Sequence, residues 1–232
     1  MRRARISKRR YKDEVKLSIL GLGGMVLVDL DRKSADSVVA EAFERGVNYF
    51  DVAPFYGNGE AEKSMGIALA PYRNRVFLAC KTLERSASGA LSELDESLRR
   101  LRTDERFPLE YIQFPVNIVC CARGHFGPQV LEKAINLGVA RLAIKAMAHG
   151  PWRKNEKRIY PNCWYRPIDD RDLARQALRY TLSQNVTAAI PPGDIRLFRM
   201  ALDMADDLPP LNTQEYGELT ATASNLRPLL ST

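Results

Sequence analysis

Two short apolar runs with a helix-like segment between them constrain this chain more than any other feature. The runs are Val47 to Val52 and Val76 to Cys80, and the segment between them contains GEAEKSMGIALA. Both runs are rich in β-branched or aromatic residues and are bounded by turn residues, which is typical of buried strands. Two strands joined by a helix form a β-α-β unit with parallel strands. We therefore predict an α/β fold built on a parallel sheet.

Three residues with chemically active side chains lie at or near the ends of these runs. Asp51 lies at the end of the first run, Tyr56 follows five residues later, and Lys81 ends the second run. The carboxyl ends of parallel strands meet at one rim, where ligands of α/β folds bind. An ammonium about 4 Å from a phenol oxygen favours the phenolate by a few kcal/mol, and would lower the pKa of Tyr56 from about 10. Tyr56 would then be a usable acid, with Asp51 holding Lys81, and such an acid suits carbonyl reduction.

With these residues in place, the chain resembles the aldo-keto reductases. The resemblance is carried by GLGGM (Gly21 to Met25), by the D-x-x-x-x-Y pattern of Asp51 and Tyr56, by Lys81, and by the helix LSELDESLRRLRTD. It implies a (β/α)8 barrel of the TIM type. It also implies reduction of an aldehyde or ketone to an alcohol, with Tyr56 as the proton donor assisted by Lys81 and Asp51. The implied cofactor is NADP, with NAD as the alternative.

The resemblance also assigns candidate cofactor residues. They are Gly23, Gly24, Met25, Gln113, Lys145, Pro191, Gly193 and Arg199. The adjacent glycines let a ligand approach the backbone closely, although a tight turn explains them equally well from the residues alone. The resemblance puts Gln113 on the nicotinamide carboxamide and Lys145 where many relatives stack a tyrosine on the nicotinamide.

The cofactor's phosphate is expected at the PPGD segment. This segment precedes a predicted helix, and a helix N-terminus after the last barrel strand is a ready phosphate site. The family often has a lysine here that binds the 2′-phosphate of NADP, but this chain has Pro192. Arg196 or Arg199 would have to supply the charge, which weakens the preference for NADP over NAD.

Candidate substrate residues lie after the predicted seventh strand. His149 follows that strand at the correct rim, and Trp152 begins a long loop rich in aromatic and basic residues. Long loops at a barrel's active rim usually shape the substrate site. Ordinary loop packing explains both residues as well, and so it does for Trp164 and Tyr165.

A part of the family's barrel is missing from this chain. After Thr103 the sequence runs directly into YIQFPVN (Tyr111 to Asn117), which resembles the sixth strand. The resemblance places two βα units in between, with the active-site histidine and a Ser-Asn pair that holds the carboxamide. We predict one domain, residues 1–232, truncated to about six βα units by a deletion near 103–106. Three explanations are compatible with the sequence: a true deletion, a shortened chain, or residues omitted from the numbering.

This gap keeps a second functional hypothesis open. The chain could be a catalytically impaired relative that serves as a binding or scaffold protein, because part of the reductase machinery is absent. A true deletion would also leave the third and sixth strands with unpaired edges. Such edges lead to aggregation, strand exchange between subunits, or closure of the barrel with six strands.

Other elements follow from periodicity and capping signals. We expect a hairpin over 9–16, a first barrel strand over 17–22, and later strands over 139–147 and 186–190. Helices are expected over 34–45, 88–102 and 128–137, with one capped by Asp169 or Asp170. A final helix should start at Asn212, where Glu215 completes a capping box.

Composition narrows the remaining possibilities. The net charge is +7 and six of the first ten residues are basic, but no nucleic-acid motif accompanies them. We interpret residues 1–10 as a solvated basic arm and expect no nucleic-acid partner. The sequence has no apolar run near the length of about 18 residues that a membrane span needs. The four cysteines lack metal-ligand spacing, so we expect no metal and a reduced, cytoplasmic protein. The oligomeric state stays open.

Overall fold

The computed structural model describes residues 6–12, 14–104 and 111–231. The helices are α1 (Arg32–Glu44), α2 (Glu60–Leu69), α3 (Ala87–Leu101), α4 (Ile118–Ala122), α5 (Pro128–Asn136), α6 (Arg171–Ser183), α7 (Ile195–Met204) and α8 (Thr213–Ser224). The strands are β1 (Lys8–Lys12), β2 (Val15–Ser18), β3 (Leu22–Gly23), β4 (Tyr49–Asp51), β5 (Phe77–Ala79), β6 (Tyr111–Pro115), β7 (Ala140–Ile144), β8 (Ala148–Gly150), β9 (Arg166–Pro167) and β10 (Ala188–Ile190). Short 3₁₀ helices are η1 (Gly24–Leu27), η2 (Tyr56–Gly59) and η3 (Ala70–Arg75).

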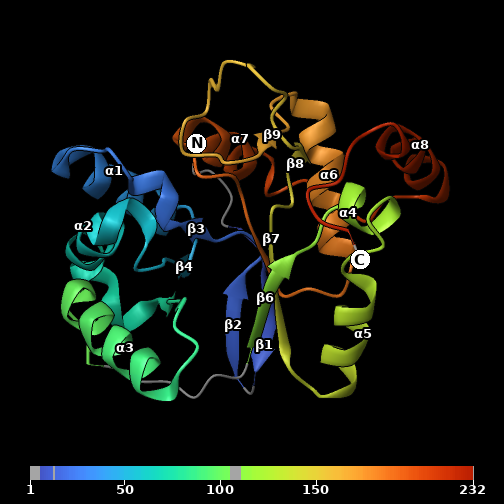
Figure 1. The fold of residues 1–232 in the computed structure, drawn as a ribbon. Coiled ribbons are helices and arrows are strands. Elements are labelled where there is room, and N and C mark those ends of the chain that lie inside the picture. The colour runs from blue at the N-terminus through green and yellow to red at the C-terminus, as the bar shows by residue number, and fades with distance from the viewer. Residues whose placement is uncertain (1–5, 13, 105–110, 232) are drawn as a thin grey trace.

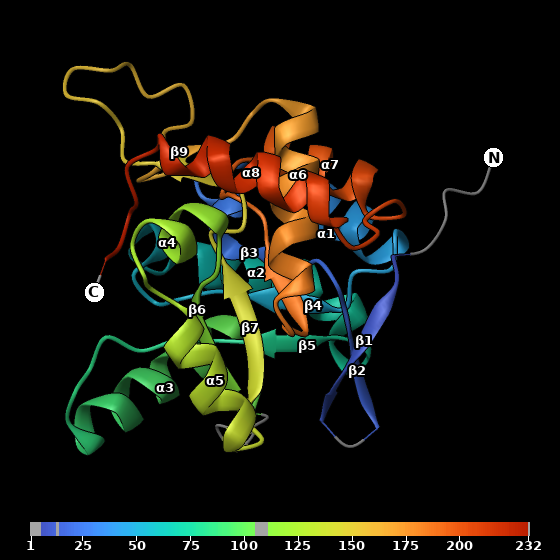
Figure 2. The same cartoon turned by 90° about the vertical axis from the view of Figure 1, so that its right-hand side faces the viewer.

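The parallel strands lie side by side, with helices packed outside them (Figures 1 and 2). Strands β3, β4 and β5 form one parallel group, and β10, β7 and β6 form another. A parallel bridge between Leu20 and Ala189 joins the groups, supported by the Gly21 N–H, which donates to the Ala189 carbonyl at 3.0 Å. The order is therefore β5-β4-β3-β10-β7-β6. This arrangement confirms the predicted α/β fold of the TIM-barrel type, and the described residues supply six parallel strands.

The barrel is open where the two βα units were expected. In the described part of the chain, β5 pairs only with β4, and β6 pairs only with β7. Side chains cross the opening instead: the Tyr111 hydroxyl donates to the Cys80 carbonyl at 3.4 Å, and the Tyr111 and Phe77 rings meet edge to face. Tyr11 from the β1-β2 hairpin packs on Phe77 with ring centroids 4.9 Å apart. An aromatic cluster of Tyr11, Phe77 and Tyr111 therefore connects β5, β6 and the hairpin across the opening. The predicted deletion point falls partly on residues 105–110, which lie outside the described residues.

Most local predictions are confirmed. The β1-β2 hairpin is antiparallel, and β4, α2 and β5 form the predicted β-α-β unit. Asp170 caps α6 by accepting a hydrogen bond from the Leu173 N–H. The capping box of Asn212 and Glu215 starts α8.

The first barrel strand is the main local correction. We predicted one strand over 17–22, but the structure has β2, a single bridge at Leu20, and then β3. Ser18 lies at the interruption: its N–H donates to the Asn48 side chain at 2.7 Å and its hydroxyl donates to the Leu20 carbonyl at 2.7 Å. Ser18 still pairs with Lys8 in the hairpin, so these side-chain hydrogen bonds lie where the chain passes from the hairpin into the barrel.

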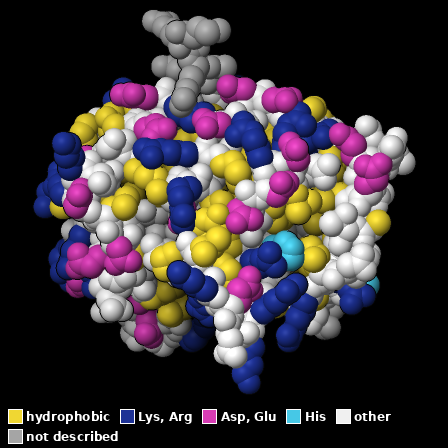
Figure 3. Space-filling model, turned by 90° about the horizontal axis from the view of Figure 1, so that it is seen from above, with side chains coloured by type: hydrophobic (Ala, Val, Ile, Leu, Met, Phe, Trp, Pro, Cys, Tyr) yellow, Lys and Arg dark blue, Asp and Glu magenta, His cyan; other side chains and the backbone are white. Residues whose placement is uncertain are grey.

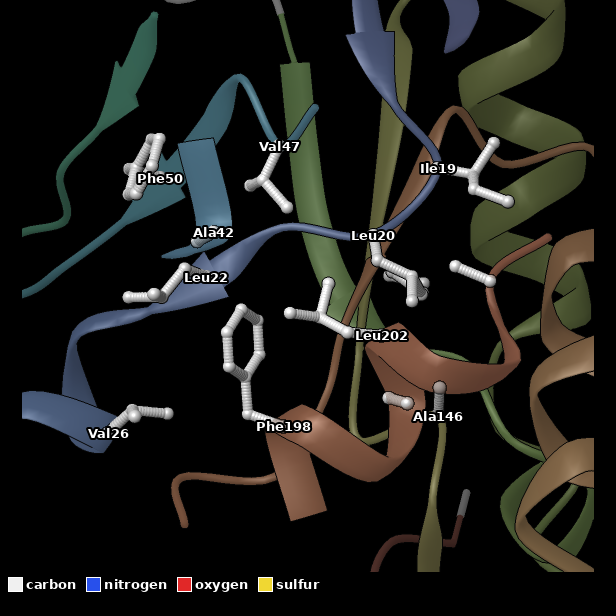
Figure 4. Close-up of a cluster of buried hydrophobic side chains, with 14 of the residues drawn as sticks. Ile19, Leu20, Leu22, Val26, Ala42, Val47, Phe50, Ala146, Phe198 and Leu202 are labelled. Carbon is white, nitrogen blue, oxygen red and sulfur yellow. The ribbon is translucent and has the colours of Figure 1, made fainter. Parts of the chain in front are cut away.

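The barrel is filled on both sides of the strands. Figure 4 shows Leu20 and Leu22 of the strand region near Phe198 and Leu202 of α7, and Phe50 belongs to the same cluster. A smaller cluster lies among the strands themselves and consists of Leu17, Tyr49, Ala79, Leu142, Ala188 and Ile190. The interior is thus a packed core, as is usual for such barrels, and the strand ends form a rigid rim. In the described part of the chain, no helix combines the length and apolarity needed to cross a membrane.

Candidate active site at the strand ends

The structure brings Asp51, Tyr56 and Lys81 together at the rim. Asp51 is the last residue of β4, and Lys81 lies two residues beyond β5. The Lys81 ammonium donates to Asp51 Oδ2 at 2.5 Å and to the Val52 carbonyl at 3.3 Å. Lys81 Nζ also lies 5.3 Å from the centroid of the Tyr56 ring. Neighbouring parallel strands thus place all three side chains in one cluster.

A turn of unusual backbone conformation follows Tyr56. Gly57, Asn58 and Gly59 all have positive φ, at 56°, 52° and 89°. Glycine adopts this region without steric cost, and asparagine tolerates it better than most residues. The turn also brings Gly59 against Arg100, where an added Cβ would lie 3.0 Å from the guanidinium. Helix α2 starts directly after this turn. The position of Tyr56 is therefore fixed by β4 before it and by the turn and α2 after it.

Gln113 extends the cluster across the opening of the barrel. Its amide nitrogen on β6 donates to Asp51 Oδ1 at 3.0 Å and to the Tyr49 hydroxyl at 2.8 Å. Asp51 is only 2% exposed and Tyr49 is fully buried. Sequence reasoning missed Tyr49, although its position two residues before Asp51 on the same strand face could have indicated it. The predicted cofactor residue Gln113 therefore holds the carboxylate that holds Lys81.

The pKa of Tyr56 moves opposite to our expectation. Burial raises the pKa of the Tyr56 phenol, and the Lys81 ammonium offsets only part of this rise. Burial also disfavours the charged form of Lys81, but Asp51 and Tyr56 more than compensate, and the pKa of Lys81 is raised. The prediction of a net lowered Tyr56 pKa was wrong because it considered the neighbouring charge and not the loss of water around the ring.

The predicted cofactor segments after β3 and β10 are in contact. A Cβ added to Gly193 would lie 2.5 Å from the Cβ of Met25. A Cβ on Gly23 would meet Ile190 at 2.9 Å, and one on Gly24 would meet Val52 at 2.7 Å. GLGGM and PPGD are thus packed side by side through Met25 and Gly193. Gly23 and Gly24 are required for packing against Ile190 and Val52, whether or not a ligand approaches them.

The positive charges near PPGD already have partners. Asp194 caps α7 and forms an ion pair with Arg196 at 2.8 Å. Arg199, the predicted phosphate ligand, pairs with Glu41 of α1 at 2.8 Å. The side chains of Arg196 and Arg199 are 61% and 47% exposed. Their carboxylate partners Asp194 and Glu41 are only 12% and 27% exposed, so a phosphate bound here would have to draw the arginines away from partly buried carboxylates.

Lys145 stands apart from ordinary surface lysines. It follows β7 directly, with φ of 61°, and its ammonium lies 5.0 Å from the centroid of the Trp164 ring. Burial lowers the pKa of Lys145 to about 8, and the nearby charge of Lys81 contributes to this shift. Lys145 therefore belongs to the electrostatic surroundings of Lys81.

The predicted substrate residues share one cavity. His149 and Trp152 line a cavity of about 340 Å³, and none of Asp51, Tyr56 and Lys81 is among the residues that line it. The indole N–H of Trp152 donates to the Cys163 carbonyl at 2.8 Å, which fixes the ring in the loop. Among the described residues, no group of three or more His, Cys, Asp or Glu side chains is arranged to hold a metal ion.

Comparisons with known proteins agree with this geometry. Residues 19–117 match the model of the aldo/keto reductase family. The segment that matches the aldo-keto reductase YhdN of Bacillus subtilis is 34% identical over 100 residues, covering 38% of this chain and 30% of that protein. The segment that matches the methylglyoxal reductase YeaE of Escherichia coli is 34% identical over 98 residues, covering 40% of this chain and 34% of that protein. The matched sequence thus spans about a third of these relatives' lengths.

Solved structures extend the likeness to the fold of the chain. An aldo-keto reductase from Klebsiella pneumoniae in complex with NADPH superposes with a TM-score of 0.70 at 17% identity, over 98% of each chain. The holo form of AKR11C1 from Bacillus halodurans gives a TM-score of 0.69 at 18% identity, also over 98% of each chain. By sequence, the likeness to aldo-keto reductases covers residues 19–117; by fold, it covers the chain.

Proposed function

We propose that this chain, whose residues 19–117 match the aldo-keto reductase family, reduces an aldehyde or ketone to an alcohol with NADPH or NADH. One observation carries the proposal: the buried Asp51 carboxylate holds the Lys81 ammonium at 2.5 Å, and that ammonium lies 5.3 Å from the Tyr56 ring centroid. A phenol next to a fixed cation at the strand ends of an α/β barrel is suited to giving a proton to a carbonyl oxygen.

Each of the three residues has a separate role in the proposed reaction. Tyr56 gives its proton to the carbonyl oxygen as negative charge develops there. The raised pKa keeps the phenol protonated at neutral pH, so the donor is present in nearly every molecule. Lys81 stabilises the phenolate that remains. Asp51, held in turn by Gln113, keeps the ammonium in place.

The residues around this cluster suit a nicotinamide dinucleotide. When bound, the dinucleotide supplies the hydride. Lys145 is electrostatically coupled to Lys81, and Gln113 contacts Asp51, which supports a nicotinamide bound beside these two residues. The contact between Met25 and Gly193 joins the GLGGM and PPGD segments, which would hold the rest of the molecule. Arg196 and Arg199 are exposed cations that could turn from their carboxylates to a 2′-phosphate, which favours NADP. The Klebsiella pneumoniae neighbour contains NADPH.

A turnover assay tests the proposal. NADPH oxidation should be measured with methylglyoxal and 4-nitrobenzaldehyde for the unmodified chain, Tyr56→Phe and Tyr216→Phe. Tyr216 lies on α8 and is 46% exposed, so its variant controls for loss of a hydroxyl elsewhere. Removing a general acid typically costs about 10²–10⁴-fold in rate, and we expect at least 100-fold for Tyr56→Phe. Equal rates for Tyr56→Phe and the unmodified chain would refute the assigned role of Tyr56.

A second candidate function is a binding or scaffold protein without turnover. The raised Tyr56 pKa favours it, because a phenol that gives up its proton less readily is a weaker acid. The two functions separate in one experiment: the scaffold hypothesis predicts NADPH binding by fluorescence with no carbonyl-dependent oxidation above that of Tyr56→Phe.

A further inference from the structure

The cavity that contains His149 and Trp152 has an unusual lining. It has a volume of about 340 Å³ and lies between the loop after β8, strand β9 and the chain segment after α8. Its charged or aromatic lining residues are His149, Trp152, Arg153, Lys154, Arg166 and Arg227. No carboxylate is among the described residues that line it. Four permanent positive charges therefore surround one small space.

These cations are poorly neutralised by the protein. Arg166 pairs with Glu156 at a distance of 3.7 Å, which is long for an ion pair. Within the described part of the chain, the side chains of Arg153, Lys154 and Arg227 have no ion pair. Figure 3 shows the face that carries the loops at the top of Figure 1, with lysine and arginine side chains gathered beside a histidine. Like charges held close together are unfavourable unless an anion compensates them.

His149 is affected by the charges around the cavity. Burial lowers the pKa of His149, and Arg166 and Arg153 lower it further, with Asp169 and Glu156 opposing. The imidazole is therefore neutral near pH 7 and can donate one hydrogen bond while the cations supply the charge. Asp169 is engaged by the Tyr160 hydroxyl at 3.1 Å and does not line the cavity.

The walls of the cavity are held in place. Gly150 has φ of 154°, and a Cβ there would lie 2.7 Å from the Arg227 carbonyl oxygen, so the segment after α8 is seated directly on the loop. Trp152 is fixed by its hydrogen bond to Cys163 and by packing against Tyr160 and Leu197. The cavity therefore has fixed walls, although the side chains of Arg153, Lys154 and Arg227 at its edge are exposed to solvent.

We propose that this cavity binds a small organic dianion, a molecule with carboxylate or phosphate groups that ion-pair with Arg153, Arg166 and Arg227 while a flat portion packs on Trp152. Guanidinium groups suit both anions, because they present paired donors that match carboxylate and phosphate oxygens. The site is separate from Tyr56, so ligand binding here does not depend on turnover.

Isothermal titration of the full chain tests the site with three probes: inorganic phosphate, malonate and NADPH. We expect phosphate or malonate to bind, with an affinity that falls as salt is raised. Arg227→Gln should weaken binding about tenfold or more, since it removes a charge-assisted hydrogen bond. Lys157→Gln is the matched control, because Lys157 lies in the same loop and does not line the cavity.

The probes also identify the source of the anion. Binding of NADPH alone, weakened by Arg227→Gln and unaffected by Lys157→Gln, would support the proposal with the cofactor's phosphate as the anion. Arg153→Gln provides a second test if Arg227→Gln fails to fold, since Arg153 is exposed. The proposal is overturned if none of the three probes binds at millimolar concentration, or if the Lys157 control weakens binding as much as the cavity variants do.

Discussion

Replacing Lys81 by methionine would leave the Asp51 carboxylate buried without its cation. The Asp51 side chain is 3% exposed, whereas that of Lys81 is 24% exposed. Breaking a buried ion pair by removing one partner costs about 3–5 kcal/mol, and we expect Lys81→Met to fall in this range. Asp51→Asn should cost less, about 2 kcal/mol, because the lysine can shift its ammonium toward water and the asparagine can still accept from Gln113.

The double variant tests this asymmetry directly. Asp51→Asn with Lys81→Met removes both charges, so the free energy of unfolding should fall by less than the sum of the single changes. We expect a coupling energy of about 2 kcal/mol, measured by urea unfolding at pH 7 for the four proteins of the cycle.

An exposed ion pair in the same chain provides the control. Lys63 and Glu60 are 2.7 Å apart, but their side chains are 54% and 64% exposed. The cycle of Lys63→Met and Glu60→Gln should give a coupling of about 0.5 kcal/mol or less, since exposed helix pairs contribute little. If the Asp51–Lys81 coupling is no larger than this, burial is not what makes the pair strong, and our account of the cluster is wrong.

Three further predictions concern other parts of the molecule. Gly66→Ala should destabilise the chain by about 2 kcal/mol in urea unfolding, because the new Cβ would lie 2.6 Å from the Arg100 carbonyl oxygen. Gly217→Ala on α8 should stabilise it by up to about 1 kcal/mol, since no atom of the described residues lies within 4 Å of the new Cβ. The reverse order of the two variants would contradict this. Asn212→Ala should cost about 1 kcal/mol through loss of the capping box, with an unchanged free energy of unfolding as the contrary result. The pKa of Lys145 is about 8 in the folded chain against an ordinary 10.5, so the unfolded chain holds the extra proton between these values and stability should rise with pH across that window. Lys145→Met should abolish this part of the rise in thermal unfolding, and an identical pH profile for both proteins would count against the shift.

Local signals in the sequence determined much of the fold. The apolar runs around Asp51 and Lys81 predicted two parallel strands, and the capping residues Asp170 and Asn212 predicted where α6 and α8 begin. These features depend on side-chain periodicity and on hydrogen bonds within a few residues, which is why they can be recognised without tertiary information. The meeting of Asp51, Tyr56 and Lys81 follows from the same logic, since parallel strands end at one rim.

Contacts between distant residues decided the rest. The direction of the Tyr56 pKa depends on how much water the folded chain removes, which no spacing of charges along the sequence gives. Gln113 contacts Asp51 from 62 positions away, and Arg199 pairs with Glu41 across 158 positions. The basic cavity likewise exists only because the segment around Arg227 is seated on the loop after β8. Burial and charge pairing are properties of the assembled barrel, because they arise only when residues far apart in the chain share the same space.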